Sequence, residues 1–194
     1  MTTFLISPES LPATGKLYVL DDQAIWLDPI GEFGMNCRIL KPLHAEITLY
    51  PQEEGVLLRG RLSGEVAVPC NRCAEEATVV IDQAIDSFEP YPPLPIPARP
   101  KKRKGREEES VPLDPDMDDA VMRINPETQR REMDLAALAW EEFSLALPVK
   151  PLCDARCKGL CPVCGVNKNS ETCSCVTEEG DPRLAKLRNL TIKR

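Results

Sequence analysis

Histidine is nearly absent from this 194-residue sequence, which contains a single one, His44. A catalytic zinc ion usually has histidine or carboxylate ligands and one open coordination position, and His44 is far in sequence from every clustered cysteine. The sequence also lacks a serine–histidine–aspartate set, a phosphate-binding glycine loop and a paired-carboxylate motif. We therefore expect no enzymatic activity and interpret His44 as an ordinary strand residue.

Long hydrophobic runs are also missing. No segment approaches the roughly 18 to 20 apolar residues that cross a bilayer, and the first residues, MTTFLISPES, lack the basic region and apolar run of a signal peptide. We therefore expect a cytoplasmic protein whose thiols stay reduced and which has no membrane partner. The formal net charge is -7, but acidic residues dominate residues 1–90, whereas residues 183–194 carry only basic charges. Any contact with nucleic acid is therefore expected from the second half.

Cysteine, in contrast, is abundant: the chain has 9, and six of them lie in residues 151–175, PLCDARCKGLCPVCGVNKNSETCSC. The stretch Cys161-Pro162-Val163-Cys164-Gly165 has the shape of a rubredoxin-like knuckle, in which the glycine lets the backbone turn so that amide hydrogens point at the thiolates. This segment has too few apolar residues to form a core, so a metal or disulfides must replace one. A reducing cytoplasm favours structural zinc over disulfides.

A second C-x2-C pair, Cys70 and Cys73, lies far upstream and brings the clustered thiols to eight, enough for two tetrahedral four-thiolate zinc sites. Spacing leaves an alternative open, in which one zinc binds among the six downstream cysteines and the upstream pair is redox-active or metal-free. A redox role is not favoured, because the pair does not open a helix in a βαβ unit. Cys37 has no partner and is interpreted as a small buried hydrophobe. The favoured partition places Cys161, Cys164, Cys173 and Cys175 in one site and Cys70, Cys73, Cys153 and Cys157 in the other.

Residues 1–90 have the pattern of an antiparallel β domain, either a meander or barrel-like. Residues Leu17–Pro29 predict a short strand, a polar turn and a second short strand, and the alternation from Leu43 to Leu49 predicts a half-buried strand. The C-x2-C pair should form the tightest corner of this meander. Gly60 and Gly64, inside a long strand run, indicate a bulge or a strong bend.

Residues 91–119 break every periodic pattern with prolines, the basic run Lys101–Arg106 and acidic residues, which predicts a flexible linker. The basic run is interpreted as a solvated spacer; contact with RNA phosphates is the alternative.

Residues 120–194 are expected to form a third part. A short extended piece at Arg123–Pro126 precedes an amphipathic helix over 134–147, with Asp134 as its N-cap and Pro148 after its end. After the cysteines, Asp181–Arg194 predicts a short basic C-terminal helix. The expected fold class is therefore α+β: a β half, a charged proline-rich linker, a helix, a cysteine-rich zinc knuckle and a closing helix.

Several motifs of the sequence resemble those of the YceD family, bacterial and plastid proteins described as large ribosomal RNA subunit accumulation proteins. They are the corner V-x-C-N-R-C, the helix end L-A-L-P-V-K-P-L-C, the block C-K-G-L-C-P-V-C-G-V-N-K-N-x-x-x-C-x-C and the closing D-P-R-L-A-K-L-R-N-L. Some members lack most of these cysteines, so this chain resembles a cysteine-rich version. Where the family usually has N-L-N, this sequence has Asn167-Lys168-Asn169, which adds a positive charge.

The resemblance implies a non-enzymatic, RNA-associated factor in ribosome biogenesis, whose partner is ribosomal RNA, a large-subunit assembly intermediate or a ribosomal protein. The alternative is a zinc-stapled adaptor whose acidic β half binds a basic protein without contacting RNA. Either reading leaves the oligomeric state open. The residues expected to contact RNA are Lys158, Lys168, Arg183, Lys186, Arg188, Lys193 and Arg194.

Overall fold

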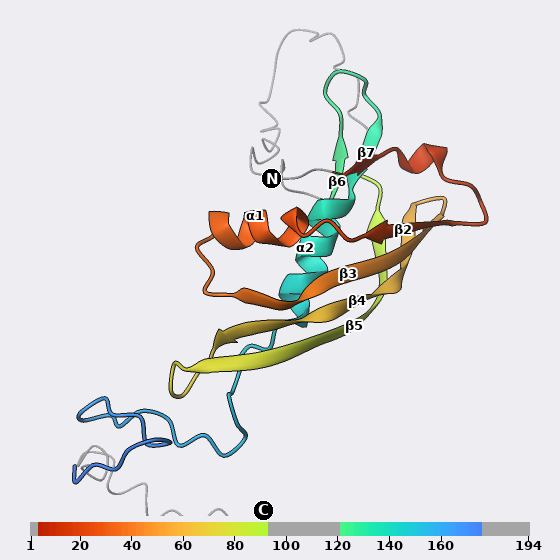
Figure 1. Cartoon of the computed structure of the whole chain (residues 1–194). Coiled ribbons are helices and arrows are strands. Elements are labelled where there is room, and N and C mark those ends of the chain that lie inside the picture. Colours follow the sequence, from red (N-terminus) through yellow and green to blue (C-terminus); the bar gives the residue numbers. More distant parts are fainter. Residues whose placement is uncertain (1–3, 93–120, 176–194) are drawn as a thin grey trace, which may run out of the picture.

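The largest element of the computed structural model, which describes residues 4–92 and 121–175, is an antiparallel sheet of four strands (Figure 1). Strands adjacent in the sheet are consecutive in the chain, in the order β2-β3-β4-β5, as expected for a meander. Within the described residues β2 and β5 are the outer strands and do not pair with each other, so the sheet is open and the barrel-like alternative was wrong. The strands are β2 (Lys16–Leu20), β3 (Arg38–Pro51), β4 (Gly55–Pro69) and β5 (Glu76–Pro90).

The two faces of this sheet differ in polarity. The alternation predicted for β3 is confirmed, because Leu43, Ala45, Ile47 and Leu49 are all buried. On the opposite face, charged side chains pair between strands, among them Arg61 of β4 with Asp82 of β5. Such exposed pairs stabilise a fold by well under about 1 kcal/mol each. One face therefore carries the core, and the other is solvated.

A bulge interrupts β3 where this strand lies opposite Gly64 of β4. The register of β3 against β4 shifts between Lys41 and His44, and Gly64 has a φ of 153°. A Cβ at Gly64 would lie 2.6 Å from the Leu43 side chain, and a Cβ at Gly60 would overlap the backbone of β3. The predicted bulge is therefore confirmed, and both glycines allow the strands to approach closely.

Helix α1 (Ala24–Glu32) replaces the second short strand that the sequence predicted within Leu17–Pro29. The Asp22 carboxylate accepts a hydrogen bond from the Ala24 amide at 3.0 Å, which helps the first turn to form. The alternation around Trp26 was too short to distinguish a strand from a helix, and burial against a second helix decides the outcome. The side chains that α1 buries are Ile25, Trp26, Pro29 and Ile30.

Helix α2 (Leu135–Ala146) lies where the sequence predicted a helix over 134–147, and Asp134 is its N-cap as expected. The Asp134 carboxylate accepts hydrogen bonds from the Ala136 amide at 2.9 Å and from the Phe4 amide at 3.2 Å. The same aspartate therefore caps the helix and fixes the start of the described chain.

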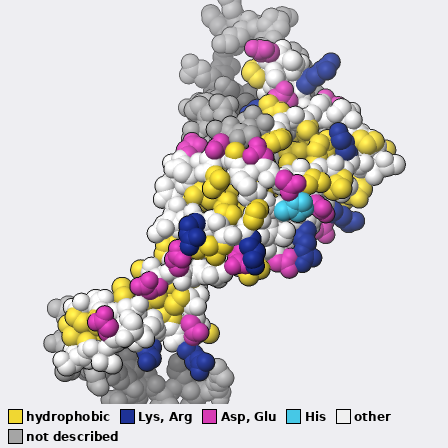
Figure 2. Space-filling view, viewed as in Figure 1, with side chains coloured by type: hydrophobic (Ala, Val, Ile, Leu, Met, Phe, Trp, Pro, Cys, Tyr) yellow, Lys and Arg dark blue, Asp and Glu magenta, His cyan; other side chains and the backbone are white. Residues whose placement is uncertain are grey.

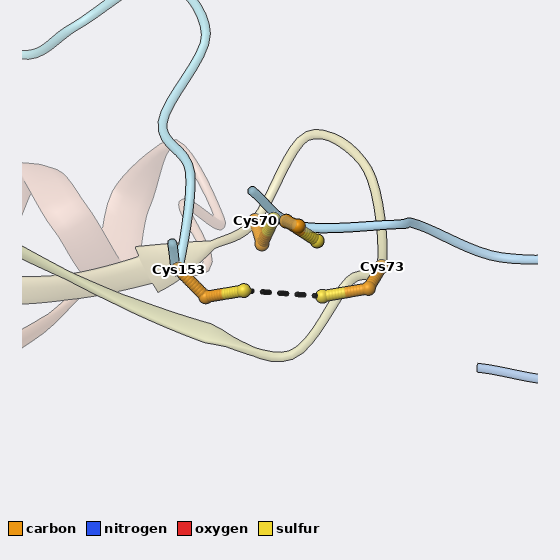
Figure 3. A group of neighbouring side chains, drawn as sticks. Cys70, Cys73 and Cys153 are labelled. Atoms are coloured by element: carbon orange, nitrogen blue, oxygen red, sulfur yellow. Dashed lines mark hydrogen bonds between the residues drawn. The ribbon is translucent and has the colours of Figure 1, made fainter. Parts of the chain in front are cut away.

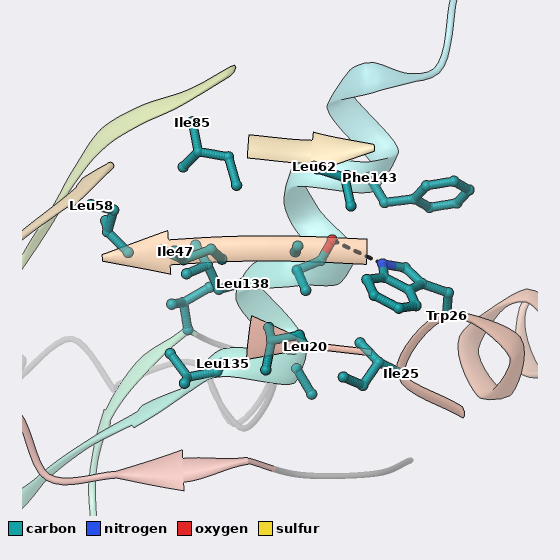
Figure 4. Packing of buried hydrophobic residues seen from close by; sticks show 14 of the residues in the cluster. Leu20, Ile25, Trp26, Ile47, Leu58, Leu62, Ile85, Leu135, Leu138 and Phe143 are labelled. Carbon is teal, nitrogen blue, oxygen red and sulfur yellow. Dashed lines mark hydrogen bonds between the residues drawn. The ribbon is translucent and has the colours of Figure 1, made fainter. Parts of the chain in front are cut away.

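Both helices pack on the apolar face of the sheet (Figure 1). Figure 4 shows Trp26 of α1 and Phe143 of α2 on the same side of the cluster, with Leu62 of the sheet close to Phe143. The indole N–H of Trp26 donates to the Ala139 carbonyl at 3.4 Å. Residues before and after the gap at 93–120 thus share one hydrophobic core.

A small second sheet joins the beginning of the chain to the segment that precedes α2. Strand β7 (Arg131–Asp134) pairs with both β1 (Leu5–Ile6) and β6 (Met122–Ile124). The short extended piece predicted at Arg123–Pro126 corresponds to β6, whereas β1 and β7 were not predicted. A single turn of 3-10 helix, Pro8–Ser10, connects β1 toward β2.

Two predicted segments lie outside the described residues: nearly all of the linker 91–119 and the C-terminal helix Asp181–Arg194. Within residues 4–92 and 121–175, neither helix has the length and apolar character needed to cross a membrane.

His44 lies on β3 between two carboxylates. Its Nδ1 contacts Asp21, and its Nε2 lies 3.4 Å from Glu46 (His44 is cyan in Figure 2). The hydrogen bond with Asp21 raises the pKa of His44, burial opposes this rise, and Glu46 adds to it. Because the folded pKa is raised, this stabilisation is fully present below about pH 6.5 and is lost as the pH rises through the folded pKa.

We predict that Asp21→Asn lowers the pKa of His44 and that Glu46→Gln lowers it less, because the Asp21 contact is the largest cause of the shift. The chain has one histidine, so its ring resonances in an NMR titration can be assigned without ambiguity. An unchanged titration curve in Asp21→Asn would show that the ion pair does not form in solution.

Candidate metal centres

The first candidate centre is built on the turn between β4 and β5. Pro69 of β4 and Glu76 of β5 form the last residue pair between these strands, and the turn that joins them contains Cys70 and Cys73. The Cys70 amide donates to the Glu75 carbonyl at 2.7 Å, and both thiols are buried at 3% exposure. The C-x2-C pair is therefore held at the hairpin corner that the sequence predicted.

The chain that leaves α2 brings two more cysteines to this corner. The Asn71 amide donates to the Pro151 carbonyl at 2.8 Å, which places the segment beside the turn. The Sγ atoms of Cys73 and Cys153 are 3.5 Å apart, and Figure 3 shows the two side chains pointing toward each other from separate segments. The Sγ atoms of Cys70 and Cys157 are 3.9 Å apart. All four sulfurs lie within 4.8 Å of one another.

The second candidate centre is local. Cys161 and Cys164 lie on a tight turn in which the Gly165 amide donates to the Cys161 carbonyl at 2.9 Å. Gly165 has a φ of 75°, which explains why glycine follows this pair. Cys173 and Cys175 return to the turn, and these four sulfurs also lie within 4.8 Å of one another.

The geometry of both groups fits a tetrahedral metal ion. Four sulfurs about 2.3 Å from a central zinc are about 3.8 Å from each other, close to the separations in the first group. All nine cysteines are free, so no disulfide competes with this arrangement. The grouping is the one favoured from the sequence. Each group could hold one metal ion, and the identity of that metal stays a prediction.

The pKa values of the thiols show why a cation would stabilise both groups. The Cys153 amide is the largest cause that lowers the pKa of Cys70 to about 6, and the amides of Cys164 and Val163 lower that of Cys161 to about 6. Hydrogen bonding with Cys73 raises the pKa of Cys153 to about 12. The pKa of Cys175 also rises to about 12, mainly through Cys164. Four thiolates at such distances repel one another, and a divalent cation removes that repulsion.

Two residues beside Cys157 were not identified as functional from the sequence. The Asn169 side-chain amide donates to the Cys157 sulfur at 3.2 Å, and Arg72 Nη1 donates to the Cys157 carbonyl at 2.8 Å. The only signal in the sequence was the family resemblance: Arg72 belongs to the motif C-N-R-C, and Asn169 is the last residue of N-K-N. Their contacts depend on tertiary packing, which spacing does not encode.

The residues expected to contact RNA are only partly described. Lys158 is exposed and lies between the two cysteine groups, whereas Lys168 is half-buried and lies in the loop of the second group. Cys37 is half-buried against the main core and belongs to neither group; its burial raises its pKa. Arg183, Lys186, Arg188, Lys193 and Arg194 lie outside the described residues.

Comparison with protein families decides the affiliation of the chain. The model of the family described as large ribosomal RNA subunit accumulation protein YceD matches residues 58–191, which include most of β4, all of β5 and all eight clustered cysteines. The chain belongs to the YceD family. The resemblance found in the sequence motifs is thereby confirmed.

Individual relatives of this YceD-family chain extend the match. An uncharacterized protein of Mycobacterium tuberculosis is 29% identical over 145 residues, which cover 75% of this chain and 60% of the relative. The chain therefore spans 60% of the length of the mycobacterial relatives that it matches. The chloroplastic large ribosomal RNA subunit accumulation protein YCED homolog 1 of Arabidopsis thaliana is 35% identical over 60 residues, 31% of this chain and 19% of that protein. No solved structure matches the chain.

Proposed function

We propose that this chain is a non-enzymatic cytoplasmic factor that promotes the accumulation or assembly of large-subunit ribosomal RNA. We further propose that both cysteine groups hold structural zinc. The observation that carries the proposal is the pair of four-cysteine groups placed at one end of the sheet of a YceD-family protein. Four thiolates fill a tetrahedral zinc ion completely and leave no position for a substrate or an activated water.

The zinc ions would fix a segment that has almost no core of its own. Near the first group, the buried cluster contains little besides the cysteines, namely Ala77 and the partly buried Leu152. Zinc would therefore supply the ordering free energy that apolar burial supplies elsewhere. A rigid segment loses less conformational entropy on binding a partner than a flexible one does.

The surface of this rigid segment combines cationic and apolar side chains. Lys158 and Arg156 are exposed, and Val163 in the second turn is 62% exposed. The lower part of Figure 2 shows basic and hydrophobic side chains beside acidic ones. Each filled centre would carry a formal charge of about -2 from four thiolates and one divalent cation. Contact with RNA phosphates would therefore depend on these lysine and arginine side chains.

We expect the double charge reversal Lys158→Glu, Lys168→Glu to remove ribosomal RNA from the material that co-purifies with the tagged chain from cell lysate. Each lost phosphate contact should lower the slope of log K against log salt by about 1. Lys16→Glu with Arg130→Glu, two exposed sites away from the cysteines, is the matched control because it changes the net charge equally.

The same purification separates the two readings of the sequence. Ribosomal RNA that is lost above moderate salt, and lost in the Lys158 and Lys168 variant alone, supports direct contact. A basic protein that stays bound after nuclease treatment, with no loss in that variant, would contradict it and favour the zinc-stapled adaptor.

A further inference from the structure

Asn169 belongs to the loop of the second centre but contacts a ligand of the first. It lies between Cys164 and Cys173, so the position of its backbone depends on that loop. Its side-chain N–H₂ donates both to the Cys157 sulfur at 3.2 Å and to the Asn167 carboxamide oxygen at 2.9 Å. Its own carboxamide oxygen accepts from the Lys158 amide at 2.8 Å. One exposed asparagine thus bridges the two cysteine groups.

The backbone between the groups is tied to the hairpin corner as well. Only three residues separate Cys157, a member of the first group, from Cys161, a member of the second. Arg72 holds both ends of this connection: its guanidinium donates to the Cys157 carbonyl, and its own carbonyl accepts from the Leu160 amide at 3.0 Å. Gly159 between them has a φ of 73°, and a Cβ there would lie 3.0 Å from the Arg72 carbonyl oxygen.

These contacts give the second centre a means of acting on the first. When the second centre is empty, the loop 165–172 loses its attachment through Cys164 and Cys173 and keeps only hydrogen bonds to residues 158–161, such as that from the Lys168 amide to the Gly159 carbonyl at 2.9 Å. The Asn169 amide is then held less firmly against the Cys157 thiolate. Hydrogen bonds from outer groups to metal ligands typically change metal affinity by roughly 10-fold to 100-fold. The effect is reciprocal, because a coupling free energy between two binding sites acts equally on both.

We infer that the two centres bind metal cooperatively and that Asn169 is the positioning residue that couples them. This inference rests on the proposed function, in which both groups hold zinc. Metal in the second centre fixes the loop 165–172. This loop then positions the Asn169 side-chain amide beside Cys157. The amide stabilises the Cys157 thiolate, which binds metal in the first centre.

Zinc titration of the reduced, metal-free full chain in competition with a chelator tests the coupling. Native mass spectrometry counts chains with zero, one and two metals. Independent sites give a one-metal fraction of about half or more at half saturation, and positive coupling that outweighs the difference in affinity between the two sites lowers it below half. We expect this depletion in the wild type and its loss in Asn169→Ala and in the nearly isosteric Asn169→Asp. Asn71→Ala is the matched control, since no side-chain hydrogen bond of Asn71 occurs in the described part of the chain.

A double-mutant cycle then separates coupling from simple unfolding of the loop. With the second centre disabled by Cys173→Ser, the first centre should lose roughly 10-fold or more in zinc affinity, and adding Asn169→Ala should change it little further. With the first centre disabled by Cys73→Ser, Asn169→Ala should leave the affinity of the second centre unchanged. Two zinc ions that bind without depletion of the one-metal species, together with a first-centre affinity that Cys173→Ser leaves unchanged, would overturn the coupling and leave the zinc proposal intact. A chain that binds no zinc would overturn both.

Discussion

In the variant Cys73→Ser, hydrogen exchange of the Asn71 and Leu160 amides should accelerate by more than about 100-fold. These amides donate to Pro151 and Arg72, the contacts that hold the cysteine segment against the hairpin corner. Zinc binding contributes on the order of 10 kcal/mol in small zinc peptides, and a site with three of four ligands loses much of this. The exchange rates therefore report directly whether metal joins the two segments.

Two further variants define the specificity of this effect. Cys37→Ser removes a thiol that belongs to neither group, so both amides should exchange as in the wild type. Cys173→Ser should accelerate exchange mainly in residues 161–175, because the corner keeps its four cysteines. Protected Asn71 and Leu160 amides in Cys73→Ser would show that the two segments are not joined through metal.

The cysteine grouping was accessible from the sequence because metal chemistry constrains it strongly. A C-x2-C corner supplies two ligands and a closed site needs four, so Cys70 and Cys73 required partners from elsewhere in the chain. The helix over 134–147 was accessible for a similar reason, since Asp134 caps it and its apolar residues recur with helical periodicity.

The features that were not predicted from the sequence depend on tertiary contacts, which a local sequence pattern does not reveal. Helix α1 is stabilised by Trp26 packing against α2, and β1 exists only because β7 pairs with its two residues. Asn169 is separated from Cys157 by a knuckle turn, so its hydrogen bond could not be read from spacing. Tertiary context decided each of these, and short segments are where it overrides local preference most often.

Removal of both metals should release residues 151–175 while the helices and the sheet stay folded. The main core, around Trp26 and Phe143, contains none of the eight clustered cysteines, so its apolar burial does not depend on metal. The cysteine segment has no comparable core, and its backbone should become accessible to proteases.

Limited digestion with trypsin measures this release. Cleavage in the predicted linker at Lys101–Arg106 should occur with or without metal. After chelation under reducing conditions, new cleavage should appear after Arg156 and Lys158, and zinc added back before the protease should suppress this new cleavage. Cleavage sites in β3 and β4, such as Arg61, should stay protected throughout, which controls for global unfolding. Equal resistance of the segment before and after verified metal loss would show that metal does not order it.

Zinc content is the most direct test of the account. Native mass spectrometry of the full chain, purified under reducing conditions, should show two zinc ions per chain, one for each group of four cysteines. Denaturation of the same sample should release both ions and leave a fully reduced polypeptide mass. A metal-free native mass lowered by disulfide formation, or a single bound zinc, would contradict two four-thiolate centres.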